Sequence, residues 1–356
     1  MATAAEDTVS FVEPDRARDP APVRRWLYAV ALLIVAMVVV GGATRLTRSG
    51  LSITEWQPIH GVVPPLSAAE WQDEFQKYQE IPQFKLLNPA MTLDAFKGIF
   101  WWEWAHRLLG RLIGLVVLVP LIFFIATGRI ERALVPKLAA IFVLGGVQGL
   151  IGWWMVRSGL AERVSVSQYR LAVHLTFACG LFAYVLWVAR GLGRPTAVAP
   201  PRLRKTAALI LLLVLVQIFL GGIVAGLHAG LISDTWPLMQ GSIFPPDLAS
   251  DLPFWRNLFE NPVTAQFDHR LVAYAVFLVA VVQLLQARGT PYRRRAVVLL
   301  GVVTLQAGLG IATILASVPL WLALLHQFVA IGVLSHAVLN LRSMTCTPAP
   351  LAGAST

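Results

Sequence analysis

Long apolar runs alternate with short polar segments along this chain, and the alternation predicts the class of protein. Eight runs consist mainly of aliphatic and aromatic residues, and each is long enough to cross the hydrocarbon core of a bilayer as a helix. The expected spans are residues 26–44, 101–126, 138–156, 168–189, 206–227, 264–286, 296–315 and 319–340. We therefore predict an all-α polytopic membrane protein with eight transmembrane helices.

The composition excludes a soluble globule. Hydrophobic residues make up 57% of the 356 positions and charged residues 13%, with a mean hydropathy of +0.67. Such a chain cannot cover a globular core with polar surface, so lipid must serve as its solvent. A net charge of +10 would suggest nucleic acid as the partner of a soluble protein. Here the basic residues are concentrated in short loops between apolar runs, so we expect no nucleic-acid partner.

The distribution of Lys and Arg predicts the orientation in the membrane. More than half of these 29 residues lie in the first tail, in the second, fourth and sixth loops, and in the last tail. The long first and fifth loops carry acidic residues such as Glu70, Asp73, Glu74, Asp234, Asp247 and Asp251. Because positively charged segments stay in the cytoplasm, we expect both termini there. The acidic first tail is unlike a signal or transit peptide, which favours a bacterial protein of the cell inner membrane.

The chain contains an internal repeat. The segment GGATRLTRSGLSITEWQPIHG, beginning at Gly41, aligns without a gap with GGIVAGLHAGLISDTWPLMQG, beginning at Gly221. Each half holds four spans, an even number, so the two copies keep the same orientation. We predict two pseudo-symmetric four-helix bundles side by side. The expected divisions are a cytoplasmic tail 1–23, an N-terminal bundle 24–189 with a large outer loop 45–100, a cytoplasmic linker 190–205, a C-terminal bundle 206–341 and a cytoplasmic tail 342–356.

Four of the seven histidines occupy corresponding positions, one near the outer start of every even-numbered span: His106, His174, His269 and His326. Facing helices of a four-helix bundle can present one imidazole each to opposite sides of a flat ligand, which is how bundles hold haem. The alternative is that each histidine is a polar residue bonded to a neighbouring helix. A zinc site is less favoured, because neither pair has a third ligand at a characteristic spacing. The two pairs therefore predict two haem sites.

An acidic residue distinguishes the two predicted sites. Glu103 lies three residues before His106, on the same helix face, whereas Gln266 takes the corresponding place before His269. A site that only holds haem for electron transfer needs no titratable group, but one that removes protons and electrons from a substrate does. Glu103 is therefore the candidate catalytic residue. A structural alternative is an (i, i+4) ion pair with Arg107.

The roles of several neighbouring residues stay open. Arg107 and Arg270 either meet haem propionates or pair with acids and lipid headgroups. The glycines in the repeated segments Gln148–Gly152 and Gln306–Gly310 are interpreted as close-packing positions. Among the other histidines His60 is the best candidate for a ligand role, because the first outer loop can fold over a ligand.

The first outer loop is expected to contain structure of its own. Ser67 and Glu70 fit a capping box, and apolar residues follow at helical spacing. We expect this helix to lie on the outer membrane surface or to cover the first bundle. Thr92 is expected to cap an outward extension of the second span.

These features resemble the haem A synthase family. The resemblance is carried by EWAHRLLGRLIG (Glu103–Gly114), by the segment from Gly41, by a second His-Arg-Leu at His269 and by the doubled four-span layout. It extends over nearly the whole chain, from position 23 to position 341. It implies oxidation of the methyl group at pyrrole position 8 of haem O to a formyl group, in two steps with water as the oxygen source.

The resemblance also implies roles for single residues. His269 and His326 would hold a haem b cofactor, His106 and His174 would take the substrate haem, and Glu103 would be essential. One branch of the family carries a cysteine pair in an outer loop, which this chain lacks, so it is placed with the proteobacterial and mitochondrial branch. Haem O and membrane lipid are the implied partners. Contacts with haem O synthase, with an electron-transfer partner and with a second copy of the chain stay open.

Two other classes of protein agree with part of the pattern. A di-haem b-type cytochrome that passes electrons from a quinol would also carry four histidines on helices, but it would not need Glu103 in one half only. A transporter would explain the repeat and the intramembrane charges. It would not explain histidine pairs at one depth.

Overall fold

The computed structural model describes residues 19–57, 60–193 and 198–345, and these residues are mainly helical and form no strand. Eight of their helices are long and apolar enough to cross a membrane, which confirms the predicted class. They are α1 (Ala21–Leu46), α4 (Leu93–Ala126), α5 (Val135–Leu160), α6 (Gln168–Gly191), α7 (Pro201–Gly226), α9 (Pro262–Gln286), α10 (Arg293–Leu315) and α11 (Leu320–Thr345).

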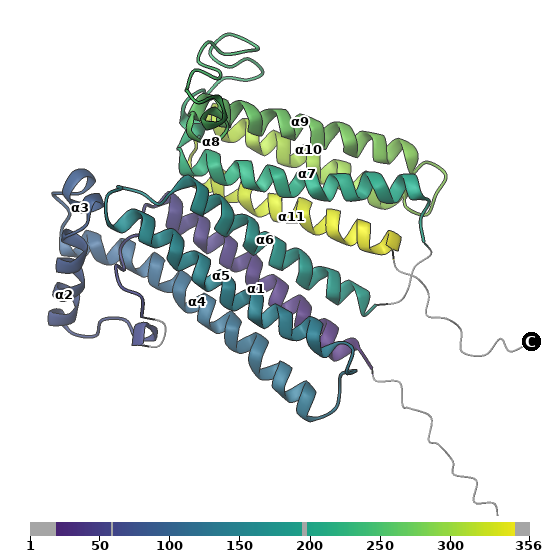
Figure 1. The fold of residues 1–356 in the computed structure, drawn as a ribbon, viewed down its shortest axis with the longest axis horizontal. Helices are drawn as coiled ribbons and strands as arrows, with labels where there is room; N and C mark the ends of the chain where they lie inside the picture. Colours follow the sequence, from purple (N-terminus) through teal and green to yellow (C-terminus); the bar gives the residue numbers. More distant parts are fainter. Residues whose placement is uncertain (1–18, 58–59, 194–197, 346–356) are drawn as a thin grey trace, which may run out of the picture.

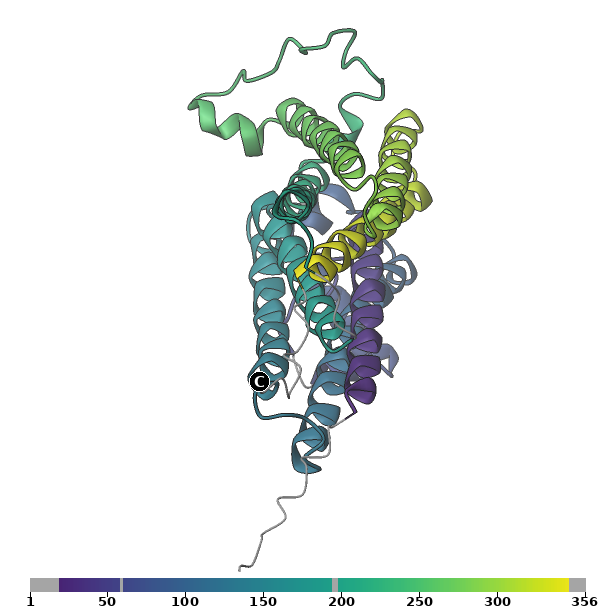
Figure 2. The same ribbon diagram turned by 90° about the vertical axis from the view of Figure 1, so that its right-hand side faces the viewer.

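The long helices form two rings of four. In the first half α1 packs against α4, α4 against α5, α5 against α6, and α6 closes the ring on α1 (Figure 1). The second half repeats this order with α7, α9, α10 and α11. Viewed from the end where α1 begins and α11 ends, the second ring lies above the first (Figure 2). Within each ring α4 lies diagonally across from α6, and α9 from α11, so side chains on these helices can face each other across a bundle.

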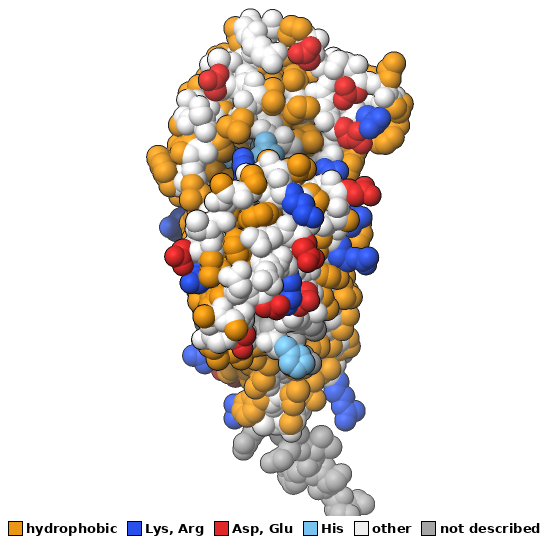
Figure 3. Space-filling view, turned by 90° about the vertical axis from the view of Figure 1, so that its left-hand side faces the viewer, with side chains coloured by type: hydrophobic (Ala, Val, Ile, Leu, Met, Phe, Trp, Pro, Cys, Tyr) orange, Lys and Arg blue, Asp and Glu red, His pale blue; other side chains and the backbone are white. Residues whose placement is uncertain are grey.

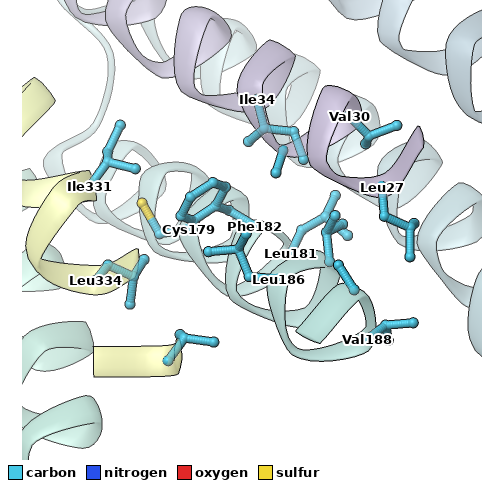
Figure 4. Packing of buried hydrophobic residues seen from close by; sticks show 14 of the residues in the cluster. Leu27, Val30, Ile34, Cys179, Leu181, Phe182, Leu186, Val188, Ile331 and Leu334 are labelled. Atoms are coloured by element: carbon cyan, nitrogen blue, oxygen red, sulfur yellow. The ribbon is translucent and has the colours of Figure 1, made fainter. Parts of the chain in front are cut away.

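The two bundles meet along α1, α6, α7 and α11. Ile34 of α1, Phe182 of α6 and Leu334 of α11 belong to one apolar core that runs through both halves (Figure 4). In contrast, the middle of α5, from position 142 to position 158, has no buried residue. Burial is therefore greatest where the halves join, and the outer helices present apolar faces to lipid.

Glycines bring α6 and α7 close together. A Cβ atom at Gly222 would lie 2.7 Å from the Cα atom of Ala172, and one at Gly226 would lie 2.6 Å from that of Gln168. Small residues spaced four apart let two membrane helices pack backbone against backbone. On the other side of the junction Gln327 of α11 donates a 2.8 Å hydrogen bond to the carbonyl oxygen of Val38 in α1. The junction thus combines close packing with a polar contact.

Short helices cover the outer end of the first bundle: η1 (His60–Val62), α2 (Ala68–Gln79) and α3 (Pro82–Leu87). The capping box of Ser67 and Glu70 is formed, and Thr92 caps α4, so both local predictions are confirmed. Tyr78 of α2 is fully buried and stacks near Phe96 of α4, with ring centroids 5.2 Å apart. This aromatic contact holds the cap on α4. The second half has only η2 (Ala229–Leu231), η3 (Phe254–Arg256) and α8 (Asn257–Glu260).

Both large loops lie at the same end of the molecule, and the first and last long helices begin and end at the other (Figure 1). The loop end carries acidic and basic side chains among apolar ones (Figure 3). This arrangement agrees with two copies that keep one orientation.

A reporter experiment tests the expected orientation. A reporter fused after Leu341 should behave as cytoplasmic, and one inserted near Asp247 should behave as periplasmic, because the basic loops stay inside. Paired alkaline phosphatase and green fluorescent protein fusions would measure this. Opposite signals at the two positions would reverse the orientation of the whole chain.

Candidate functional site

The four repeated histidines lie on the diagonal helices of the two bundles. His106 is on α4 and His174 on α6, while His269 is on α9 and His326 on α11. Each pair is close enough for its two imidazoles to interact electrostatically. The structure therefore brings the histidines together as one pair in each bundle.

A glycine on a neighbouring helix lies beside every one of these imidazoles. A Cβ atom at the glycine would lie between 2.8 and 3.3 Å from the Cε1 atom of the ring. The pairs are Gly41 with His106, Gly152 with His174, Gly221 with His269 and Gly310 with His326. The close packing inferred from the sequence for α5 and α10 thus occurs at Gly152 and Gly310, against the imidazoles themselves, whereas a Cβ atom at Gly149 or Gly308 would have no neighbour within 4 Å. The signal that pointed to this was the recurrence of each glycine at the same place in both repeats.

These residues fit a haem held between two imidazoles. The Nδ1 atoms of His106 and His269 are buried and have no hydrogen-bond partner within the described ranges. The glycines leave room for each ring beside the neighbouring helix. No group of three or more His, Cys, Asp or Glu side chains suited to a metal ion occurs among the described residues. A haem needs one imidazole from each side, and each bundle supplies such a pair.

Two substitutions in α5 test the glycine contact. Gly152→Ala should displace His174, because the new methyl group would lie 2.9 Å from its Cε1 atom, and overpacking of this kind costs ~1–3 kcal/mol. We expect loss of haem from the first bundle, measured as haem bound per polypeptide. Gly149→Ala is the matched control, since nothing lies within 4 Å of its Cβ position. Equal haem content in the two variants would contradict this role for Gly152.

Glu103 is buried, with 3% of its surface exposed, and accepts four hydrogen bonds. Ser52 Oγ and the backbone N–H of Ile53 each donate to Oε2 at 2.8 Å. Arg107 donates to Oε1 from Nε at 3.1 Å and from Nη2 at 2.6 Å. The ion pair that the sequence offered as an alternative is therefore present, and the carboxylate also fastens the first outer loop to α4.

Arg107 completes this attachment. Its Nη2 donates to the carbonyl oxygen of Ile53 at 2.7 Å, and its Nη1 donates to that of Glu55 at 2.8 Å. All three guanidinium nitrogens are therefore engaged by protein groups. The sequence left two roles open for Arg107, contact with a haem propionate or pairing with an acid. The structure shows the pairing with an acid, Glu103.

The second half repeats the scaffold with an amide in place of the carboxylate. Gln266 Nε2 donates to the carbonyl oxygen of Ser233 at 3.0 Å, and Arg270 Nη2 lies 3.4 Å from both that oxygen and Gln266 Oε1. Ser233 corresponds to Ile53 in the repeat. The Nε and Nη1 atoms of Arg270 are buried without a partner in the described part of the chain. Arg270 thus keeps donors that an anionic group such as a propionate would satisfy.

The other histidines lie away from the two pairs. His60 lines an open pocket of about 290 Å³ between the first outer loop and α4, together with Arg107 and Arg111. His228 Nε2 lies 3.0 Å from Arg45 Nη2 and so links the two halves at their outer end. Burial, with the nearby charges of Arg45 and Arg48, lowers the pKa of His228, which favours the neutral ring that accepts this bond. His60 is therefore the only one of these two that borders a pocket described here.

The fold and these sites define a multi-pass, all-α membrane protein with a repeated pair of facing histidines. The chain belongs to the family of cytochrome oxidase assembly proteins, COX15-CtaA, whose model matches residues 24–338. It is 55% identical to the heme A synthase of Brucella anthropi over 334 residues, which cover 92% of this chain and 93% of that protein. It is 56% identical to the heme A synthase of Brucella ovis, covering 92% of each chain. The family resemblance carried by the sequence motifs is thereby confirmed.

Proposed function

We propose that this protein is an oxidoreductase that converts haem O to haem A for cytochrome oxidase assembly. Its relatives across nine-tenths of the chain are named heme A synthases, and its own residues provide a suitable site. The reaction turns a methyl group of the macrocycle into a formyl group with water as the oxygen source. The protein acts within a membrane, which we infer to be the bacterial inner membrane with both termini in the cytoplasm.

One difference between the bundles supports assigning the substrate haem to the first and the cofactor haem to the second. Each bundle has a pair of histidines, but a buried carboxylate, Glu103, lies three residues before His106, whereas a buried amide, Gln266, lies three residues before His269. Oxidation of a methyl group releases protons, and a carboxylate can accept them where an amide cannot. We therefore assign the substrate haem O to His106 and His174, and a haem b cofactor to His269 and His326.

Each residue then has a defined task. His106 and His174 bind and orient the substrate between α4 and α6, and Glu103 accepts protons or orients the attacking water. Arg107 holds the carboxylate in place with two hydrogen bonds. A haem b held by His269 and His326 would supply electron transfer when bound, and the spare donors of Arg270 would be available to one of its propionates. An external electron acceptor is required and is the expected further partner.

An expression experiment decides between this function and a plain di-haem cytochrome. The protein is produced with and without a haem O supply, and bound haems are analysed by absorption spectroscopy and mass spectrometry. Formation of haem A only with the haem O supply supports the enzyme. Two b-type haems that stay unchanged under the same conditions would instead support a cytochrome. Purified protein without any haem would favour a transporter.

A further inference from the structure

Glutamine amides contact three of the four repeated imidazoles. Gln148 Nε2 lies 3.1 Å from Nδ1 of His174 and donates to the carbonyl oxygen of the same residue at 3.1 Å. Gln217 Nε2 lies 3.2 Å from Nε2 of His269 and donates to its carbonyl oxygen at 3.0 Å. Gln306 Nε2 lies 3.2 Å from both ring nitrogens of His326.

The three amides occupy one repeated position. Each glutamine lies four residues before the glycine that packs against the same imidazole, so amide and glycine share one helix face. The pattern Gln-x-x-x-Gly occurs at Gln148 in α5, at Gln217 in α7 and at Gln306 in α10. One helix thus supplies both the space for a ring and the group that fixes its direction.

The fourth position breaks the pattern. The residue four before Gly41 in α1 is Met37, which corresponds to Gln217 in the repeat. A Cβ atom at Gly110 would lie 3.4 Å from the methyl carbon of Met37, so this side chain lies against α4 one turn inward of His106. A thioether cannot donate a hydrogen bond. No amide contact to His106 accordingly occurs in the described residues; its Nδ1 has no partner there, which is also true of Nδ1 of His269, because Gln217 contacts that ring at Nε2.

The same amides can serve a histidine bound to iron. Metal-bound histidines almost always donate their other ring N–H to an acceptor, which fixes the ring and makes it a stronger ligand. The Oε1 atoms of Gln148, Gln217 and Gln306 are all buried and without a partner in the described residues. Which end of an amide faces the ring is an assignment made from hydrogen bonding, so a rotated amide can present its oxygen. For Gln148 and Gln217 this rotation replaces the bond to the histidine carbonyl oxygen, whereas Gln306 has no such bond to give up.

We propose that Gln148, Gln217 and Gln306 are positioning residues that hold three of the haem ligands, and that Met37 leaves His106 the weakly held fourth. This inference rests on the proposed function, in which the first bundle must release its product and the second must retain its cofactor. The second bundle has both imidazoles held by amides, whereas the first has one. The second bundle therefore binds its haem more tightly than the first, whose haem can exchange. The difference results from Met37, which takes the place of Gln217 in the repeat.

Exchanging the residues between the two positions tests the proposal. Gln217→Met should speed loss of the second-bundle haem about fivefold, the effect of removing one net hydrogen bond. Met37→Gln should slow loss of haem from the first bundle by a similar factor. The full-length proteins, purified in detergent with haem bound, are mixed with excess apomyoglobin, and haem transfer is followed by absorption. The low-spin spectrum of the second-bundle haem is recorded in parallel.

The control is Gln283→Met, the same substitution at a fully buried glutamine of α9 whose amide contacts no histidine. It should leave haem transfer unchanged. Opposite changes in rate at Met37 and Gln217 would support the proposal, because a general packing defect would speed haem loss in both variants. Wild-type rates in both, with an unchanged spectrum, would overturn it while leaving the proposed function intact. Wild-type protein without haem in the second bundle would overturn both.

Discussion

Replacing Glu103 by Gln should abolish haem A formation while leaving a folded protein that still holds haem in its second bundle. The amide keeps the shape of the side chain but cannot accept protons, and loss of a positioned base typically slows a reaction at least ~100-fold. Folding should survive, because the second bundle already has Gln266 beside Arg270 at this place. The ratio of haem A to haem O in membranes supplied with haem O measures the effect.

The competing account is that Glu103 only fastens the first outer loop to α4. The variant Ser52→Ala distinguishes the catalytic role of Glu103 from the fastening role. It removes one of the four hydrogen bonds to the Glu103 carboxylate and leaves the carboxylate in place. A catalytic Glu103 predicts nearly normal haem A formation by Ser52→Ala. A fastening role predicts a defect in both variants, with more rapid proteolysis of the loop. Nearly normal haem A formation by Glu103→Gln would exclude the catalytic role and leave the pair with Arg107 as the better account.

The helices were predictable because the signals that specify them are local. A run of apolar residues long enough to cross a bilayer leaves few alternatives to a membrane helix. Ser67 and Glu70 form their capping box within a single turn, and Thr92 caps α4 in the same way. Such contacts depend on neighbours within three or four positions, so they can be recognised without knowing the fold.

The surroundings of Glu103 depend on distant residues, and the sequence showed only part of them. Helix geometry predicted that Glu103 can reach Arg107 one turn away. It could not predict that Ser52 and Ile53 also donate to the carboxylate, because their loop is about fifty residues away along the chain and its path is set by tertiary packing. The same limit applies to His60, whose loop lies along the outside of α4.

The repeat predicted more than periodicity alone. Equivalent positions in the two halves identified His106, His174, His269 and His326 before any helix packing was known. The glycines were interpreted as packing positions, but what they pack against required coordinates, since Gly152 and His174 lie on different helices. The close packing of α6 against α7 depends on Gly222 and Gly226. It was likewise not predictable from the repeat, because α6 belongs to the first copy and α7 to the second.

Replacing His269 or His326 by Ala should remove the low-spin b-type spectrum proposed for the second bundle. An iron held between two imidazoles loses its strong axial field when one ligand is removed. The cavity left by the ring should also weaken retention, so haem bound per polypeptide should fall. Absorption spectra of the reduced and oxidised protein, together with haem extraction, measure both effects. Neither change should remove the substrate binding that we propose for His106 and His174, because those residues lie in the other bundle.

His336→Ala is the matched control for the change at His326. His336 lies on the same helix, α11, and its Nδ1 is 2.9 Å from the carbonyl oxygen of Gly332, a contact within the helix. Its removal takes away an imidazole of the same bundle without touching the facing pair, so the b-type spectrum should persist. A spectrum that persists in the double variant His269→Ala and His326→Ala would show that the cofactor is held elsewhere. In that case the presence of Glu103 in the first bundle and Gln266 in the second would no longer distinguish a reactive site from a cofactor site.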